Sequence, residues 1–215
     1  MKKIIGRYCL FIVGLFIASV GVAFSTIAGL GTSPVASVPY SVSLLWNVLS
    51  FGMWLNVWSV IQIAVQIILL RKKCKPVEIV IQTVLAFAYG YLTNFSCWLL
   101  RGIEPQNHLQ RFLLMLAGCM VLAVGIWIQF KGGVAMLPGE AMNRAISEVS
   151  GKKYENIKVI FDVLYIAVSA VICLIFFRKL EGVREGSIIA AVLIGNLIKL
   201  INKGWNRLVV KTKGK

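Results

Sequence analysis

The sequence contains runs of apolar residues that are long enough to cross a lipid bilayer. Two clear examples are residues 10–28 and residues 159–177. A helix rises about 1.5 Å per residue, so a run of about 20 apolar residues spans the roughly 30 Å of hydrocarbon in a bilayer. The chain is 59% hydrophobic and only 14% charged, which leaves too few polar residues to cover a water-soluble fold. The sequence therefore predicts an all-α integral membrane protein.

The apolar runs divide the chain into six long segments and two short ones. Charged or helix-breaking residues interrupt both short segments, about 34–50 and 138–150, which are predicted to be broken or interfacial helices. Whether these two span, re-enter or lie on the membrane is left open. Residues 1–215 form a single transmembrane domain in this interpretation. The six predicted transmembrane helices cover about residues 8–28, 53–70, 77–99, 111–130, 156–177 and 186–202.

The positions of Lys and Arg favour six spans over eight, because loops rich in these residues stay in the cytoplasm. Six spans place the basic cluster at residues 71–75 on the same side as both basic termini, whereas eight spans move that cluster to the other side. We therefore expect a protein of the bacterial cytoplasmic membrane with cytoplasmic N- and C-termini. The net charge of +15 then reflects topology and contact with anionic lipids, and no nucleic-acid partner is expected.

Similar residues recur in the two halves of the chain when it is shifted against itself by about a hundred positions. The halves cover about residues 8–100 and 108–205, with three predicted spans each. An odd number of spans makes the second half enter the membrane from the opposite side, which predicts an inverted internal repeat. The matched positions are Gly14 with Gly118, Gly21 with Gly125, Pro34 with Pro138, and Arg71 with Arg178.

Two glycine- and proline-containing turns occupy equivalent places in the halves. The first contains Gly31, Thr32, Ser33 and Pro34, and the second contains Pro138, Gly139 and Glu140. Proline suits the first turn of a helix, and the free N–H groups at a helix start can receive a polar ligand. One interpretation is that these are simple turns between a span and an interfacial helix. Because the same device occurs twice, the other is a substrate-binding site between the repeats.

Asp162 lies within the fifth predicted span, where an ionised carboxylate costs several kcal/mol unless it is paired or hydrated. It is a candidate proton or cation site. The alternative is a local ion pair with Lys158, one helical turn earlier. Glu140 is a second candidate, and Arg144, one turn after it, is its candidate partner. Both acids and Arg144 join the turn residues in the predicted substrate site.

The turns carry a family resemblance. Gly29-Leu30-Gly31-Thr32-Ser33-Pro34 follows a Val-Gly-Val helix, and Leu137-Pro138-Gly139-Glu140 follows a Val-Gly-Ile helix. In these features the chain resembles the YczE/YitT-like group of uncharacterised bacterial membrane proteins, which implies a multi-pass membrane protein without implying a substrate. In that family pattern an acid often follows the proline turn. Here Ala36 and Ser37 follow in the first half, so that only Glu140 keeps the acid.

These features favour a small-solute transporter over an enzyme. His108 is the single histidine, and the five cysteines are scattered without paired spacing, so neither a catalytic group, a metal site nor a cofactor is expected. The alternative is a non-transporting accessory protein, or a membrane subunit of a larger transport or biosynthetic complex. Expected partners are the lipid bilayer and a small solute, and a homo-oligomer or larger membrane complex is left open.

The six-span topology predicts opposite accessibility for two loops. In a cysteine-free background, Lys73→Cys is expected to be shielded from a membrane-impermeant maleimide in intact cells, and Gln106→Cys is expected to be labelled. Labelling of Lys73→Cys with protection of Gln106→Cys would contradict this topology, because it fits either a reversed orientation or an additional span before residue 71. Labelling at both positions would mean that residues 77–99 do not cross the membrane.

Overall fold

The computed structural model describes residues 2–178 and 183–213, and the described chain is all helical. The predicted all-α fold is confirmed. Within these ranges there are eight α-helices and one short 3-10 helix, Arg71–Lys73. In chain order the α-helices are α1 (Lys2–Ile27), α2 (Pro34–Leu45), α3 (Phe51–Leu70), α4 (Pro76–Leu99), α5 (His108–Gly132), α6 (Pro138–Ser150), α7 (Tyr154–Phe177) and α8 (Glu185–Lys213).

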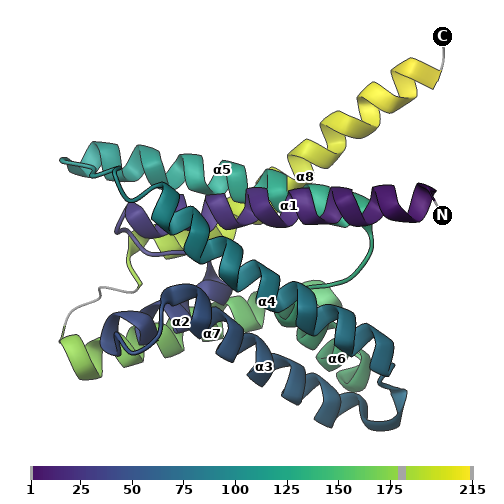
Figure 1. Cartoon of the computed structure of the whole chain (residues 1–215), viewed down its shortest axis with the longest axis horizontal. Helices are drawn as coiled ribbons and strands as arrows, with labels where there is room; N and C mark the ends of the chain where they lie inside the picture. The colour runs from purple at the N-terminus through teal and green to yellow at the C-terminus, as the bar shows by residue number, and fades with distance from the viewer. Residues whose placement is uncertain (1, 179–182, 214–215) are drawn as a thin grey trace.

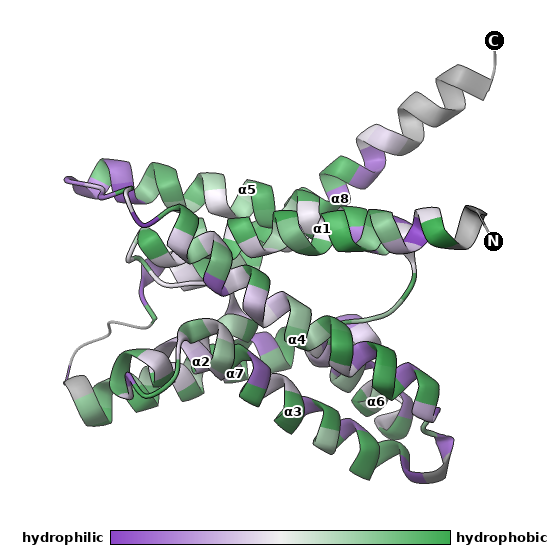
Figure 2. Ribbon diagram, in the orientation of Figure 1, coloured by the Kyte–Doolittle hydropathy of each residue, from purple (hydrophilic) through white to green (hydrophobic). Residues whose placement is uncertain are grey.

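Six of the described helices, α1, α3, α4, α5, α7 and α8, are long and apolar enough to span a membrane. The six-span prediction is confirmed in this sense. Hydrophobic residues cover these helices, and hydrophilic residues gather at their ends, such as the turn between α3 and α4 (Figure 2). The two remaining helices, α2 with 12 residues and α6 with 13, are too short to cross about 30 Å of hydrocarbon.

Several helices extend beyond the apolar runs that predicted them. α5 already begins at His108, and α8 continues to Lys213, well past residue 202. Helical hydrogen bonding continues in water, so an apolar run marks only the part of a helix that lies in hydrocarbon. In contrast, the first short helix ends earlier than expected, at Leu45, where Trp46 adopts an extended conformation.

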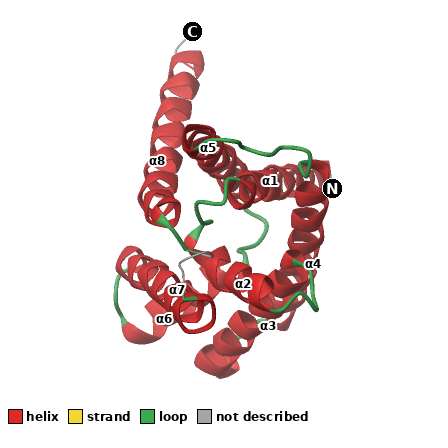
Figure 3. Ribbon diagram, turned by 90° about the vertical axis from the view of Figure 1, so that its left-hand side faces the viewer, coloured by secondary structure: helices red, strands yellow, loops and turns green. Residues whose placement is uncertain are grey.

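The core of the fold is the pair α1 and α5, which lie side by side (Figure 1, Figure 3). In the apolar stretch of α1, 56% is buried inside the protein, compared with 17% in the apolar stretches of α7 and α8. Phe11, Leu15, Ala18 and Val22 are almost completely buried along α1. α1 is therefore the central helix, while α7 and α8 keep apolar faces outward, which suits contact with lipid.

Glycines let the backbones of α1 and α5 approach closely and in opposite directions. A Cβ atom on Gly14 would lie 2.8 Å from the carbonyl oxygen of Gly125, and a Cβ atom on Gly118 would lie 2.9 Å from that of Gly21. Real Cβ atoms essentially never come this close to backbone. Small residues are the usual means of tight helix packing in membranes, where no hydrophobic effect drives helices together.

Arginines lie at both ends of this helix pair. The guanidinium of Arg7, in α1, donates hydrogen bonds to the carbonyl oxygens of Gly132 at 2.8 Å and Gly133 at 2.9 Å, where α5 ends. A cation at a helix C-terminus stabilises the unpaired carbonyl groups there. The guanidinium of Arg111, in α5, lies beside Gly29 just after α1, 3.1 Å from where a Cβ atom would stand.

The contacts between helices follow a regular pattern. α2 packs on α7 while α3 packs on α6, and α1 contacts α4 while α5 contacts α8. The set of contacting helix pairs stays the same when α1 to α4 are exchanged for α5 to α8. One pair differs in closeness: α3 and α4 pack tightly, with Gly52 donating a hydrogen bond to Asn94 at 2.8 Å, whereas α7 and α8 touch only sparsely.

The close contact between α1 and α5 makes a testable difference between two glycines of α1. A Cβ atom on Gly21 would overlap the backbone of Leu122, whereas one on Gly6 meets nothing within 4 Å. We expect Gly21→Ala to destabilise the protein by about 1–3 kcal/mol, the usual cost of overpacking. Gly6→Ala should be neutral or slightly stabilising, since alanine favours helix. Thermal unfolding in detergent measures both, and equal melting temperatures for the two variants would contradict the packing.

Candidate functional site

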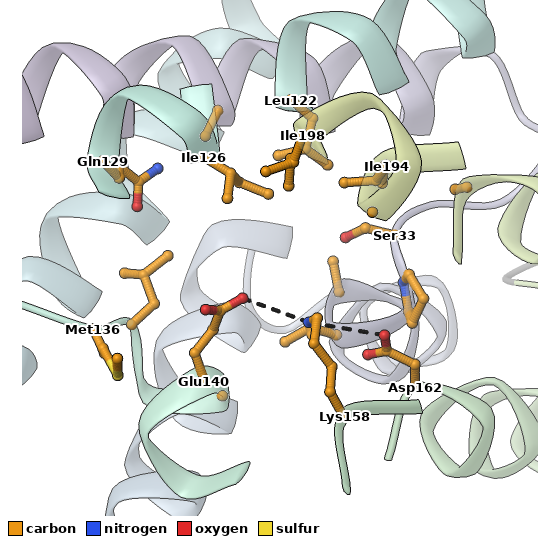
Figure 4. Close-up of a pocket in the computed structure, with 18 of the residues that line it drawn as sticks. Ser33, Leu122, Ile126, Gln129, Met136, Glu140, Lys158, Asp162, Ile194 and Ile198 are labelled. Carbon is orange, nitrogen blue, oxygen red and sulfur yellow. Dashed lines mark hydrogen bonds and ion pairs between the residues drawn. The ribbon is translucent and has the colours of Figure 1, made fainter. Parts of the chain in front are cut away.

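A cavity of about 180 Å³ lies inside the helix bundle. Leu122 and Ile126 of α5 and Ile194 and Ile198 of α8 form one side of it (Figure 4). The other side is formed by the beginnings of α2 and α6 and by α7. The cavity is thus bounded by spanning helices and by the two short helices, and most of its wall is apolar.

The glycine turns explain why two short helices begin at the cavity. Gly29, Gly31 and Gly133 have φ values of +65°, +99° and +55°, which favour glycine strongly. These residues turn the chain back after α1 and α5. Pro34 and Pro138 then start α2 and α6, as expected for a residue whose φ is already helical and whose missing N–H is not needed there.

Three charged side chains line the cavity and contact one another. The ammonium Nζ of Lys158 lies 3.5 Å from Oε1 of Glu140 and 3.8 Å from Oδ2 of Asp162 (Figure 4). The hydroxyl of Tyr154 donates a hydrogen bond to Oε2 of Glu140 at 3.4 Å. Glu140 belongs to α6 and the other three residues belong to α7, so this cluster ties a short helix to a spanning helix.

One buried oxygen of the cluster has no hydrogen-bond partner in the part of the chain that the structure describes. Oδ1 of Asp162 is buried and receives no hydrogen bond from the described residues. The Asp162 side chain is 16% exposed, compared with 22% for Glu140 and 34% for Lys158. A buried carboxylate oxygen without a donor carries a desolvation cost, so Asp162 is the least satisfied member of the cluster.

The predicted site residues fall into two groups. Ser33, Pro34, Gly139, Glu140 and Asp162 line the cavity, so the structure brings the two halves together there. The remaining predicted residues, Gly31, Thr32, Pro138 and Arg144, do not form its wall.

Most of the second group lies against other parts of the protein. Gly31 pairs with Val183 in an isolated bridge near the start of α8, and Thr32 beside it is almost completely buried. Arg144 is exposed and contacts the sulfur of Met136 at 3.8 Å, so the basic neighbour of Glu140 is Lys158.

Sequence reasoning missed the apolar wall of the cavity and the share of Lys158 in it. Lys158 could have been included, since it stands one helical turn before Asp162. Ile194 and Ile198 carry no such signal, because isoleucine in a membrane span is ordinary. Among the described residues, no group of three or more His, Cys, Asp or Glu side chains is placed to hold a metal ion.

The spanning helices and the charged cluster among them define a multi-pass helical membrane protein. Residues 5–203 match the model of a family of unknown function, DUF6198, and the chain therefore belongs to that family. No curated protein and no solved structure matches the chain.

The charged cluster predicts energetic coupling between α6 and α7. In a double-mutant cycle of Glu140→Gln and Lys158→Gln, we expect a coupling of about 0.5–3 kcal/mol, as for contacting residues in one network. Lys73 and Glu148 provide a matched control: their ion pair is 3.3 Å long and also involves α6, but its side chains are 73% and 51% exposed. Coupling there should be about 0–1 kcal/mol. Unfolding in detergent measures both cycles, and a stronger coupling at the exposed pair would contradict the expectation.

Proposed function

We propose that the protein is a carrier of a small solute, with the cavity as its binding site. The observation that supports this most directly is a cavity inside a membrane-spanning bundle that is lined by charged side chains. Ionisable groups are costly at membrane depth and usually mark a route for a solute or ion. The expected site at the paired turns is part of this proposal, restricted to the residues of those turns that line the cavity.

The proposal includes an inverted internal repeat, the arrangement on which many secondary carriers are built. The exchange of α1 to α4 for α5 to α8 preserves the helix contacts, as expected for two halves related by a two-fold axis. The contacts at Gly14 and Gly125 and at Gly21 and Gly118 are counterparts under this exchange. A two-fold axis that exchanges two antiparallel helices is perpendicular to both of them. For spanning helices this axis lies in the plane of the membrane, as an inverted repeat requires.

Two pairs of arginines further support the repeat. Arg7 and Arg111 stand at equivalent sequence positions, and each lies beside the glycine that follows the partner helix. Arg71 and Arg178 end α3 and α7, and they are the non-glycine residues with positive φ in the described chain, at 47° and 53°. A positive φ is uncommon outside glycine, so its occurrence at matched positions favours the repeat, although ψ differs between the two, −117° at Arg71 and 18° at Arg178.

The alternative is a non-transporting accessory protein or a membrane subunit of a larger complex. Only 17% of the apolar stretch of α7 and of α8 is buried, so their exposed apolar surfaces could contact another chain as well as lipid. Under either function we propose that the protein has a non-catalytic role and lies in the bacterial cytoplasmic membrane with cytoplasmic termini. The likeness to the YczE/YitT-like group is part of the same proposal.

Ligand-dependent stability separates the two functions. A solute that binds only the folded protein, at a concentration of about a hundred times its Kd, stabilises the protein by about 2.7 kcal/mol. If the protein is a carrier, some member of a metabolite panel should therefore raise its melting temperature. The same solute should enter proteoliposomes, and Glu140→Gln or Asp162→Asn should reduce its uptake. Glu148→Gln, on the exposed face of α6, should not. An absence of any stabilising solute, with copurification of a second protein, would favour the accessory role.

A further inference from the structure

The charge on the cavity wall comes from the second half of the chain alone. Ala36 stands two residues after Pro34, as Glu140 stands two residues after Pro138. Similarly, Leu55 stands as far before Arg71 as Asp162 stands before Arg178. Ala36 and Leu55 both line the cavity. The charged positions of the second half therefore correspond to apolar positions in the first half.

The cluster of Glu140, Lys158 and Asp162 holds more acidic than basic groups. Two carboxylates, Glu140 and Asp162, face one ammonium group, Lys158. The distances from Lys158, 3.5 and 3.8 Å, both exceed the roughly 2.7–2.9 Å of a strong charge-assisted hydrogen bond. With both acids ionised, the cluster lacks one positive charge.

This deficit is centred on Asp162. Glu140 lies in the first turn of α6, where the helix N-terminus stabilises a negative charge, and it also accepts the hydrogen bond from Tyr154. Asp162 lies in the interior of α7 and has no such help, and its Oδ1 is buried without a hydrogen bond from the described residues. A cation that entered the cavity would supply positive charge beside this carboxylate, which lines the wall.

The rest of the wall restricts what that cation can be. Leu122, Ile126, Ile194 and Ile198 lie across the cavity from the charged cluster (Figure 4). Apolar side chains replace no hydration shell, so a bare metal ion would gain little from them. An apolar group on the ligand would instead be favoured, at about 25 cal/mol per Å² of apolar surface removed from water.

From this asymmetry we propose that the cavity binds a small organic monocation, a protonated amine with an apolar body. The ammonium group donates to Asp162 and Glu140, and the body contacts the isoleucines of α5 and α8. Its role as transported substrate rests on the proposed carrier function, whereas its binding does not.

Three ligands of similar shape and different charge test the proposal on the full chain in detergent. Isothermal titration at pH 7 compares 2-phenylethylamine, which is cationic, with neutral 2-phenylethanol and anionic 3-phenylpropanoate. We expect the amine to bind at least about tenfold more tightly than either of the others, since only the amine brings a positive charge to the two carboxylates. Preference for the anion, or equal binding of all three, would overturn the proposal.

Variants then locate the bound amine. Asp162→Asn should weaken amine binding at least about tenfold, while leaving 2-phenylethanol unaffected, and Glu148→Gln should change neither. Lys158→Gln should strengthen amine binding, because it removes the resident competitor for the two carboxylates. Mere damage to the fold would weaken binding in both cavity variants. If Asp162→Asn does not fold, the comparison of three ligands and Lys158→Gln still decide the outcome.

The outcomes also separate this inference from the carrier proposal. Amine binding without uptake into proteoliposomes would retain the site and reject the carrier. Uptake of an anionic or neutral solute that is blocked by cavity variants would retain the carrier and reject the cation site.

Discussion

The close contact between α1 and α5 is the constraint on which the other parts of the structure depend. Without the glycines at this contact, the two helices would separate by the width of a side chain, and the helices that pack on them would follow. α4 lies against α1, and α8 lies against α5. Ala18 and Leu122, from the two helices of the pair, also face the cavity. The distance between the central helices therefore sets the dimensions of the cavity.

The short helices bring helix N-termini into the bundle of apolar helices. A continuous span exposes its backbone N–H groups only at the membrane surface, whereas α2 and α6 begin at the cavity and bring helix N-termini to it. In α6 this position is used by Glu140. In α2 no acid occupies the first turn, and Val35 and Ala36 line the cavity there. The same backbone device thus supports a charged surface in one half and an apolar one in the other.

The sequence predicts this fold well where a single physical property decides the outcome. Apolar length decides which helices span, and glycine followed by proline decides where α1 and α5 end and the short helices begin. The pairing of α2 with α7 and of α3 with α6 could not be predicted from the sequence. Ser169 of α7, for example, donates a hydrogen bond to the carbonyl oxygen of Ser37 in α2 at 3.0 Å, but nothing in the sequence marks these two serines as partners. The same holds for the site: Glu140 and Asp162 stand out as acids in apolar surroundings, whereas Ile194 and Ile198 do not. Gly31 and Thr32 differ from them, since the turn that contains them predicted a binding role and they do not line the cavity.

The burial of α1 has a consequence for how the chain enters the membrane. α1 is synthesised before its main partner, α5, which follows only after α2, α3 and α4. Until then the face of α1 that later contacts α5 is turned to lipid. Polar residues on that face would weaken the retention of α1 in the bilayer. This explains why α1, which is the central helix of the finished fold, is apolar on nearly all sides. The composition of α1 satisfies the demands of membrane insertion as well as those of the finished fold.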